Sequence, residues 1–525
     1  MTNLTDILHY GSKEYPNRTA IIFGQNKFTY DEVLNRASAV ACALKSWQVK
    51  KGERIAILLD NSPDFIFCYF GVLLAGAVVV PINHMFKREE AKYILQDSES
   101  VGILTSSAYS EMALELNVIL GSLKFVALTN KNTENAYSLS EYLDGKKHAE
   151  LDISPKACED GELAVFLYTS GTTGHPKAAM LTHNNLLSNA ISSSKTIRVA
   201  AGDTFICFLP LFHSFAATVC MIMPLLNGAK TVIMKSPRPI KKLLRAIRKN
   251  KVTIFVGIPS LYQILAEMKL PKFLAPWLLR FFNPVRLAIS GAAALPIEVF
   301  LKFEKKYGIP LLEGYGLTEA SPVVSLNPLK GRRKPGSIGL PIPDTKVKIT
   351  DENGTSLRAE QIGELCVKGP GVMQGYFKRS DENETVLRDG WLMTGDMAKL
   401  DSENYITIMG RKKEMVNVRG LNVYPREIEE VLYQHPQIKE AAVIGIPDLH
   451  KGEVPKCYCV LKAEGSLTEH QIIAYLKEHL ALYKIPRRVE IRKELPKNSS
   501  GKILKRVLVE ENIKNVDIKI KTSHN

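Results

Sequence analysis

Cysteine is scarce in this sequence, with eight among 525 residues, too few for a disulfide framework in so long a chain. Cys457 and Cys459 stand two residues apart in an alternating stretch, which places both on one face of a strand. No second cysteine or histidine pair at zinc spacing accompanies them. We therefore expect buried, reduced thiols in a cytoplasmic chain.

Long apolar runs are also rare. Residues 65–82 carry no charge, but Gly71 and Gly76 interrupt them, and the composition becomes β-branched just before Pro81. This change predicts a buried helix that leads into a buried strand rather than a membrane span. Residues 204–229 are broken by two prolines and a histidine, and the first 20 residues hold no run of signal-peptide length. No membrane helix is predicted.

The composition excludes several other classes of protein. Apolar residues make up 45% and charged residues 23%, with no repeat and no low-complexity segment, so disordered chains and solenoids are excluded. The net charge of +15 would suit phosphate-rich ligands, an anionic membrane or nucleic acid. The basic runs lack interleaved aromatics and any reader motif, so nucleic acid is not expected as a partner.

The order of strand-like and helix-like segments predicts an α/β fold. Over the first 400 residues apolar strands such as 54–59, 163–168 and 253–256 alternate with helical patterns, which is typical of parallel sheets covered by helices. From about residue 336 shorter alternating strands with polar turns predict an antiparallel appendix, a small barrel.

A second unit is expected after a very polar stretch at residues 410–414. It contains a strand, a helix that Pro425 opens, strands near 440–446 and 456–461, and a helix over 468–480. We therefore predict a large N-terminal body over residues 1–410 and a smaller α+β domain over residues 411–525.

The most informative string is residues 168–177, which read Tyr-Thr-Ser-Gly-Thr-Thr-Gly-His-Pro-Lys directly after an apolar strand. Its two glycines let the backbone approach an anion, its hydroxyls and N–H groups are donors, and Lys177 adds a cation. It is not a Walker A loop, because Gly174 is followed by His-Pro-Lys. The string predicts a phosphate-binding loop.

Six more strings follow in a fixed order, and together they resemble the adenylate-forming superfamily of acyl-CoA synthetases, luciferases and peptide synthetase adenylation domains. The strings are residues 209–213, 290–293, 313–319, 390–396, Gly410–Arg411 with Gly420, and 496–502. The resemblance implies an N-terminal body of two mostly parallel sheets plus a small β-barrel, and a mobile C-terminal domain. The predicted boundary coincides with the hinge of that superfamily.

The resemblance also implies a reaction in two steps with ATP, Mg²⁺ and coenzyme A. A carboxylate attacks the α-phosphate of ATP to give acyl-AMP and pyrophosphate, and a thiol then displaces AMP. Catalysis of this kind is mostly positioning and charge stabilisation. Thr318 is expected to donate to the α-phosphate, and Glu319 to hold Mg²⁺. The residues expected to grip the β- and γ-phosphates are Thr169, Ser170, Gly171, Thr172, Thr173, Gly174 and Lys177.

Other residues of these strings are expected to bind the nucleoside. Tyr315, between Gly314 and Gly316 in the string that Glu313 opens, offers a stacking face for adenine, and Asp396, with Arg411 beside it, suits a ribose diol. The small-residue wall of the adenine slot is expected from Gly291, Ala292 and Ala293.

Two lysines of the C-terminal unit have different implied roles. Lys502 is expected to meet the substrate carboxylate and the α-phosphate during adenylation. Lys413, two residues after Arg411, matches the hinge residue of the superfamily. His213 is expected to gate the acyl pocket, with a core histidine as the alternative.

An apolar acid is the expected substrate. Residues 212–223 contain no acidic side chain that could pair with a substrate amine, and Ala216 and Ala217 leave room for a chain. Strings 334–341 and 374–378 look most like medium- or long-chain fatty acyl-CoA synthetases. No carrier domain is present, so the thiol comes from coenzyme A or from a free acyl carrier protein. An aryl or other acid–CoA ligase, or a non-catalytic lipid- or nucleotide-binding relative, are the alternatives.

Peripheral membrane contact is a further expectation. Pro239 opens a helix with apolar residues on one face and five basic residues on the other, and residues 273–282 are rich in interfacial residue types. The alternative is a helix that packs on a sheet with its apolar face and exposes its basic face to solvent.

Overall fold

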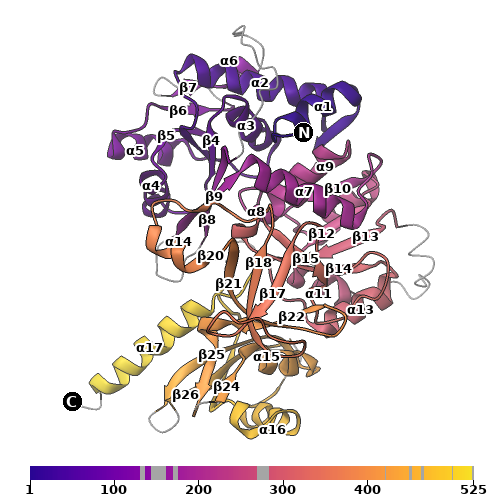
Figure 1. The fold of residues 1–525 in the computed structure, drawn as a ribbon, viewed down its shortest axis with the longest axis vertical. Helices are drawn as coiled ribbons and strands as arrows, with labels where there is room; N and C mark the ends of the chain where they lie inside the picture. Colours follow the sequence, from indigo (N-terminus) through magenta and orange to yellow (C-terminus); the bar gives the residue numbers. More distant parts are fainter. Residues whose placement is uncertain are drawn as a thin grey trace.

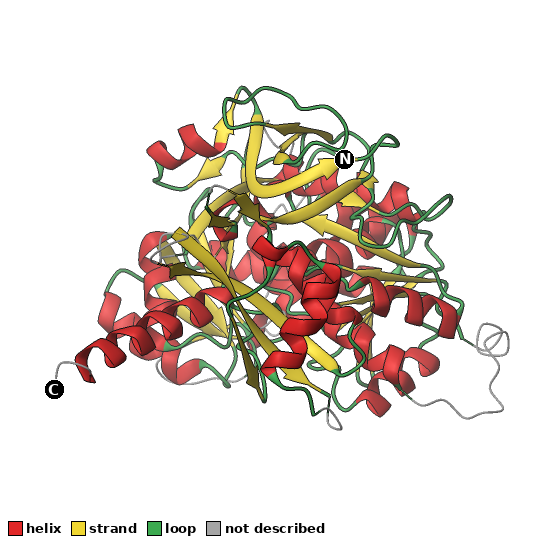
Figure 2. Ribbon diagram, turned by 90° about the horizontal axis from the view of Figure 1, so that it is seen from below, coloured by secondary structure: helices red, strands yellow, loops and turns green. Residues whose placement is uncertain are grey.

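The computed structural model describes residues 1–130, 136–143, 161–169, 176–268, 283–419, 421–448, 452–462, 466–498 and 501–522. Figure 1 shows a large body that contains the N-terminus and, below it, a smaller unit from which the last helix extends. Helices and strands are mixed throughout rather than segregated, which confirms the predicted α/β class (Figure 2).

The first large sheet has eight strands. Six neighbouring strands run parallel, and two antiparallel strands complete one edge. The order is β19 (Gly375–Tyr376), β9 (Lys177–Thr182), β8 (Leu163–Thr169), β4 (Val78–Pro81), β3 (Arg54–Leu58), β5 (Ser100–Thr105), β6 (Phe125–Leu128) and β7 (Tyr137–Ser138).

The second large sheet has nine strands, six of them parallel neighbours. The order is β16 (Leu340–Pro341), β15 (Val323–Leu326), β14 (Leu311–Gly316), β13 (Leu287–Ser290), β12 (Ile254–Gly257), β10 (Thr204–Cys207), β11 (Lys230–Ile233), β1 (Thr19–Phe23) and β2 (Asn26–Thr29). One continuous hydrophobic cluster contains residues of both large sheets, so the two form a single body.

Helices cover these sheets, and the uncharged stretch over residues 65–82 shows why. Helix α3 (Pro63–Leu74) begins at a Ser62 cap and is buried almost all round, and it leads into the fully buried β4. This confirms a buried helix followed by a buried strand. No helix in the described ranges is long and apolar enough to cross a bilayer.

The remaining helices of the body have the following bounds: α1 (Asp6–Glu14), α2 (Tyr30–Ser46), α4 (Arg88–Asp97), α5 (Ser110–Leu120), α6 (Ser140–Leu143), α7 (His183–Ile197), α8 (Ser214–Ala216), η1 (Ala217–Ile222), α9 (Met223–Leu226), α10 (Ile240–Lys249), α11 (Pro259–Glu267), α13 (Ile297–Tyr307), η2 (Thr318–Ala320) and α14 (Ser380–Val386).

A third sheet follows the two large ones, where the sequence predicts a small barrel. It is five-stranded and entirely antiparallel, with the order β17 (Lys346–Thr350), β18 (Gly363–Lys368), β21 (Trp391–Leu400) and β20 (Leu387–Arg388), and with β22 (Ile406–Arg411) also paired to β21.

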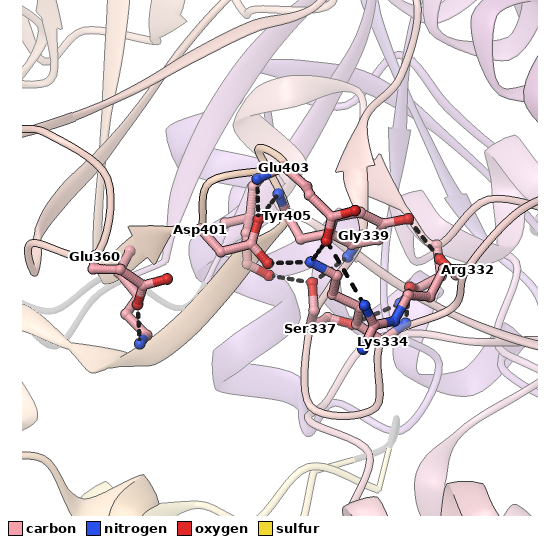
Figure 3. A network of polar contacts seen from close by, with 11 residues as sticks. Arg332, Lys334, Ser337, Gly339, Glu360, Asp401, Glu403 and Tyr405 are labelled. Carbon is pink, nitrogen blue, oxygen red and sulfur yellow. Dashed lines mark hydrogen bonds and ion pairs between the residues drawn. The ribbon is translucent and has the colours of Figure 1, made fainter.

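Polar contacts fix this third sheet to the segment before β16 (Figure 3). The Lys334 Nζ lies 2.5 Å from an Asp401 carboxylate oxygen and also pairs with Glu403. Tyr405 donates to the carbonyl of Arg332 at 2.5 Å, and the Ser337 hydroxyl donates to the carbonyl of Ile406 at 2.7 Å. The third sheet is therefore held against the edge of the nine-stranded sheet.

The last unit is a separate sheet with its own helices and core. Its strands are β24 (Leu421–Val423), β23 (Val416–Val418), β26 (Gly452–Leu461), β25 (Ile438–Asp448) and β27 (Arg488–Arg492), and its helices are α15 (Pro425–Gln434), α16 (Glu469–His479) and α17 (Lys505–Thr522). A short turn, η3 (Lys412–Glu414), lies between β22 of the body and β23 of this unit.

Both thiols of the alternating stretch point into that core from β26. Burial raises the pKa of Cys457 well above its ordinary value and that of Cys459 to about 12. This confirms that both cysteines are buried on one strand face.

Candidate active site

One large cavity, of about 940 Å³, lies where the two large sheets, the third sheet and the C-terminal unit meet. It receives residues from strings that are far apart in the sequence. The predicted site residues that line it are Thr169, Lys177, His213, Gly291, Ala292, Gly314, Tyr315, Gly316, Thr318, Glu319, Arg411, Lys413 and Lys502.

Strands β8 and β9 form the phosphate-loop end of the cavity. Thr169 ends β8, Lys177 begins β9, and the two residues are register partners in the antiparallel pair. Tyr93 donates to the carbonyl of Pro176 at 3.1 Å, which fixes the residue before Lys177. The loop residues Ser170, Gly171, Thr172, Thr173 and Gly174 lie outside the described residues.

Lys177 and Glu319 share an aromatic neighbour, Tyr376 of β19. The Tyr376 hydroxyl donates to Glu319 Oε1 at 2.7 Å, and the Lys177 ammonium lies 5.6 Å from the centre of the Tyr376 ring. Thr318 lies beside Glu319 in η2, with its hydroxyl 3.3 Å from that of Ser214. A cation, a carboxylate and two hydroxyls therefore face the same space.

Asp396 forms a covered pair with Arg411, which lines the cavity. The two are register partners of β21 and β22, and Arg411 Nε lies 2.6 Å from Asp396 Oδ1, while the Tyr315 hydroxyl donates to Oδ2. Asp396 is only 3% exposed, and burial raises its pKa, although Arg411 opposes that rise. Tyr315 and Arg411, rather than the carboxylate itself, make the wall of the cavity here.

Glu313 and Ala293 differ from the predicted positions, because neither lines the cavity in the described part of the chain. The Glu313 carboxyl is buried behind the wall, where it accepts a hydrogen bond from the backbone N–H of Leu295 at 3.0 Å. Burial raises the pKa of Glu313 to about 7. Glu313 therefore supports the turn at residues 291–295.

Lys502 reaches the cavity from the C-terminal unit. It follows a tight turn in which Asn498 accepts from the backbone N–H groups of Gly501 and Lys502, each at 2.9 Å. Gly501 has φ +79°, a backbone conformation that favours glycine, and a Cβ there would lie 2.8 Å from Ile258 Cδ1, so the two units approach closely at this turn.

The surroundings of Lys502 hold charges of both signs. Removal from water and repulsion by Arg411 lower its pKa, while Asp396 acts in the opposite direction. The Lys502 charge also contributes to the lowered pKa of His213, after burial. These couplings place Lys502 close to Asp396 and Arg411, where an anionic substrate would stabilise its charge.

His213 reaches the cavity and also has a local hydrogen-bond partner. It lines the cavity, and its Nδ1 also accepts from the backbone N–H of Phe215 at 3.4 Å, which caps α8. The Phe215 ring fills the space where a Cβ on Gly291 would lie, at 2.7 Å. A side chain at position 291 would therefore have to displace this ring.

A second part of the wall is apolar and comes from α7, α8, η1, α9, β13 and β15. Helix η1 is a π-helix, a form that is frequent at functional sites, and it lies within the segment predicted to hold the acyl chain. The apolar lining includes Ile197, Phe215, Val219, Met223, Ile289, Val323 and Leu326.

Sequence reasoning missed several lining residues, among them Tyr376, Asn498 and Glu382 with Thr385 of α14. Tyr376 and Asn498 lie in strings already noted, so their positions could have signalled a role. The segment of α14 reads as an acid-rich, solvated helix start and carries no such signal.

Comparison with known proteins agrees with this geometry. A family model described as AMP-binding enzyme matches residues 8–377, and one described as AMP-binding enzyme C-terminal domain matches residues 427–502. The long-chain-fatty-acid–CoA ligase of Bacillus subtilis (strain 168) is 37% identical, over 98% of this chain and 96% of its own. The feruloyl-CoA synthase of Amycolatopsis sp. is 34% identical, over 93% and 95%.

Among solved structures, MatB from Rhodopseudomonas palustris is 30% identical in two states. The ATP-bound form superposes with a TM-score of 0.88, over 97% of this chain and 98% of that one, and the apo form gives 0.78 over the same shares. Since both forms have one sequence, the difference reflects how their parts are arranged, and this structure is nearer the ATP-bound arrangement. Its fold, its ordered strings and these full-length matches show that the chain belongs to the AMP-binding enzyme family.

Proposed function

We propose that this protein is an AMP-forming acid–thiol ligase that activates a fatty acid with ATP and Mg²⁺ and transfers the acyl group to coenzyme A. The observation that carries this is a single cavity in which charged residues and an apolar wall adjoin. An acyl chain on the apolar wall would present its carboxylate to the space that Lys502 reaches. AMP and pyrophosphate are the other products.

Several residues have proposed roles at the polar end. Lys177 contacts the β- and γ-phosphates, Thr318 donates to the α-phosphate, and Lys502 neutralises charge where the carboxylate meets that phosphate. Tyr315 stacks on adenine, and Arg411 and Asp396 are the residues that bind the ribose. These assignments follow the superfamily strings. All of these side chains line the cavity except that of Asp396, which lies behind Tyr315 and Arg411.

The residues present suit Mg²⁺, which commonly binds one or two carboxylates together with substrate phosphates. Glu319 faces the cavity from η2, and the described residues contain no cluster of three or more histidine, cysteine or acidic side chains that would form a complete protein cage. When bound there, Mg²⁺ would reduce the negative charge of the phosphates.

We further propose that residues 1–410 and 411–525 act as two units joined by a hinge at Lys413. The chain leaves the third sheet at Arg411 and enters the last sheet at Val416, and η3 is the short link between them. A change of a few torsions in this link would move Lys502 without disturbing either core.

A long-chain fatty acid is the proposed substrate, and an aryl acid is the alternative that the feruloyl-CoA synthase relative suggests. The name of the Bacillus relative and the apolar wall support the fatty acid. The test is ATP–pyrophosphate exchange without thiol across fatty, aryl and amino acids of graded size. Best stimulation by aryl or amino acids would overturn the proposal. Replacing coenzyme A by holo acyl carrier protein in the second step tests the acceptor.

Substitution of Val219 by tryptophan should shorten the acyl site. Val219 is buried in η1 and lines the apolar wall, so an indole there would occupy the path of a long chain. We expect exchange with long-chain acids to fall roughly 10–100-fold while short acids retain activity, a loss on the scale of a few misplaced methylenes. Val219→Ala is the matched control and should keep long-chain activity. Equal losses for short and long acids in Val219→Trp would show that this wall does not hold the chain.

We also propose that α10 makes a peripheral contact with anionic membrane. No acidic residue occurs between Asp203 and Glu267, whereas nine basic residues do. Leu243 is fully buried, and Ile240 and Ile247 pack on the core, so the helix does cover the sheet as the alternative holds. Its outward side chains have no acidic partner among the described residues: Lys241, Lys242, Arg245, Arg248 and Lys249. Residues 273–282 lie outside the described part of the chain.

Charge reversal tests this contact. Lys241→Glu, Lys242→Glu and Arg245→Glu together should weaken co-sedimentation with anionic vesicles about 10²-fold or more, given ~1 kcal/mol for each basic residue near such a surface. The control reverses three exposed lysines elsewhere, Lys27, Lys330 and Lys346, with the same change in net charge. Failure of the unchanged protein to pellet at low salt, or equal loss in both triple variants, would refute a specific contact.

A further inference from the structure

The phosphate-loop lysine already has an anionic partner inside the cavity. The Lys177 ammonium pairs with the carboxylate of Glu382, a residue of α14. The Lys177 side chain is 9% exposed and that of Glu382 is 34% exposed, so the cation is fixed in the wall and the carboxylate is nearer to solvent. Both side chains line the cavity.

Two anchors bring Glu382 to this position. Arg379, just before α14, pairs with Asp97 of α4 at 2.8 Å, and it also donates to the Tyr93 hydroxyl at 3.3 Å. Asn383 is the second anchor and fixes α14 to β19. Its side-chain amide accepts from the backbone N–H of Tyr376 at 2.6 Å and donates to the carbonyl of Tyr376 at 2.9 Å.

These anchors connect α14 to the strand that carries Lys177. Tyr376 lies in β19, which pairs directly with β9, and Tyr93 donates to the carbonyl of Pro176. The framework that positions the lysine therefore also positions the carboxylate, and the pairing is not a chance contact of two long surface side chains.

Lys177 needs an anion at this place. Burial lowers the pKa of Lys177, and Arg379 lowers it further, while Glu319 has the opposite effect. A partly buried ammonium with a guanidinium nearby is costly without a compensating negative charge. In the absence of nucleotide, Glu319 supplies part of that charge from a distance, and Glu382 supplies it by direct pairing.

We propose that Glu382 is an internal counter-ion that competes with the β- and γ-phosphates of ATP, and with pyrophosphate, for Lys177. This inference rests on the proposed function, in which Lys177 contacts those phosphates. A carboxylate and a polyphosphate repel each other at the same ammonium, so nucleotide binding requires Glu382 to turn toward solvent. AMP has no β- or γ-phosphate, and its binding is independent of the exchange.

Replacing Glu382 by glutamine tests the exchange, because the amide keeps the shape and removes the charge. We expect binding of a non-hydrolysable ATP analogue and of pyrophosphate to tighten roughly two- to fivefold at low salt, the scale of a partly exposed ion pair. The gain should shrink as salt rises, and AMP binding should stay unchanged. Calorimetric titration of the full chain with each of the three probes measures these effects.

Three further variants make the test specific. Glu384→Gln removes the same charge from an exposed position on the same helix and should change nothing. Glu382→Asp keeps the negative charge but moves it away from Lys177, because the side chain is one methylene shorter. This variant should show part of the gain in ATP-analogue and pyrophosphate binding. In a Lys177→Met background the gain from Glu382→Gln should disappear, which measures the coupling directly.

Weaker binding of the ATP analogue in Glu382→Gln would overturn the inference, since Glu382 would then help to hold the nucleotide or its metal ion. Unchanged binding, or an equal gain in Glu384→Gln, would overturn it as well. Failure of the unchanged protein to bind either ATP analogue or AMP would instead refute the proposed function, so the two failures are distinguishable.

Discussion

Adenylate formation should slow roughly 10²–10³-fold or more when Lys502 is replaced by alanine, the scale of losing one preorganised charge donor. In this structure Lys502 faces Asp396 and His213 of the N-terminal body and Arg411, the last residue of β22. Arg411 is already paired with Asp396, so Lys502 is the cation of the C-terminal unit that is placed to meet a carboxylate and the α-phosphate.

The second half-reaction separates this role from a structural one. The Lys502→Ala variant should still convert supplied acyl-AMP and coenzyme A to thioester, because that step does not need the ammonium. Pyrophosphate release without thiol and thioester formation from synthetic acyl-AMP measure the two steps. Lys493→Ala, an exposed lysine of the same unit, is the control and should leave both steps intact.

Replacement of Lys413 by proline should give the opposite pattern, near-normal adenylate formation and loss of thioester formation. Proline fixes φ near −65°, which suits the helical turn η3 of the present arrangement but prevents a large change of torsion there. The residue would then hold Lys502 in the adenylation pose.

A control variant separates the loss of the Lys413 side chain from the restriction of the backbone. Lys413→Ala removes the ammonium without fixing the backbone, so it should retain thioester formation. If the proline variant loses both steps equally, or if alanine and proline behave alike, Lys413 is not the hinge of this protein.

The sequence predicted the parts of the site that lie in contiguous strings. Lys177 after a glycine-rich loop, Thr318 with Glu319, and Lys502 in its Pro-Lys-x-x-Ser-Gly-Lys frame all reach one cavity, because each string is a turn at the end of a strand or helix. Two apolar sheets and the buried α3 were predictable for a similar reason, since burial determines composition locally.

The rest depends on contacts across the chain. Glu382 meets Lys177 from 205 residues away, and nothing in its helix distinguishes it from solvated neighbours. Glu313 belongs to a nucleotide-binding string, yet its carboxyl turns behind the wall to Leu295. Asp396 is covered by Tyr315 and Arg411, and only the pairing of β21 with β22 reveals this. Strings identify residues, and topology decides which way they face.

Isotope transfer from the acid to AMP tests the central claim most directly. The protein is incubated with ATP, Mg²⁺, coenzyme A and a long-chain fatty acid labelled with ¹⁸O in its carboxylate. The masses of the products are then measured by mass spectrometry. If the carboxylate attacks the α-phosphate and the thiol then displaces AMP, one labelled oxygen should appear in AMP and none in pyrophosphate. Label in inorganic phosphate or pyrophosphate with none in AMP, or thioester formed without labelled AMP, would contradict the mechanism.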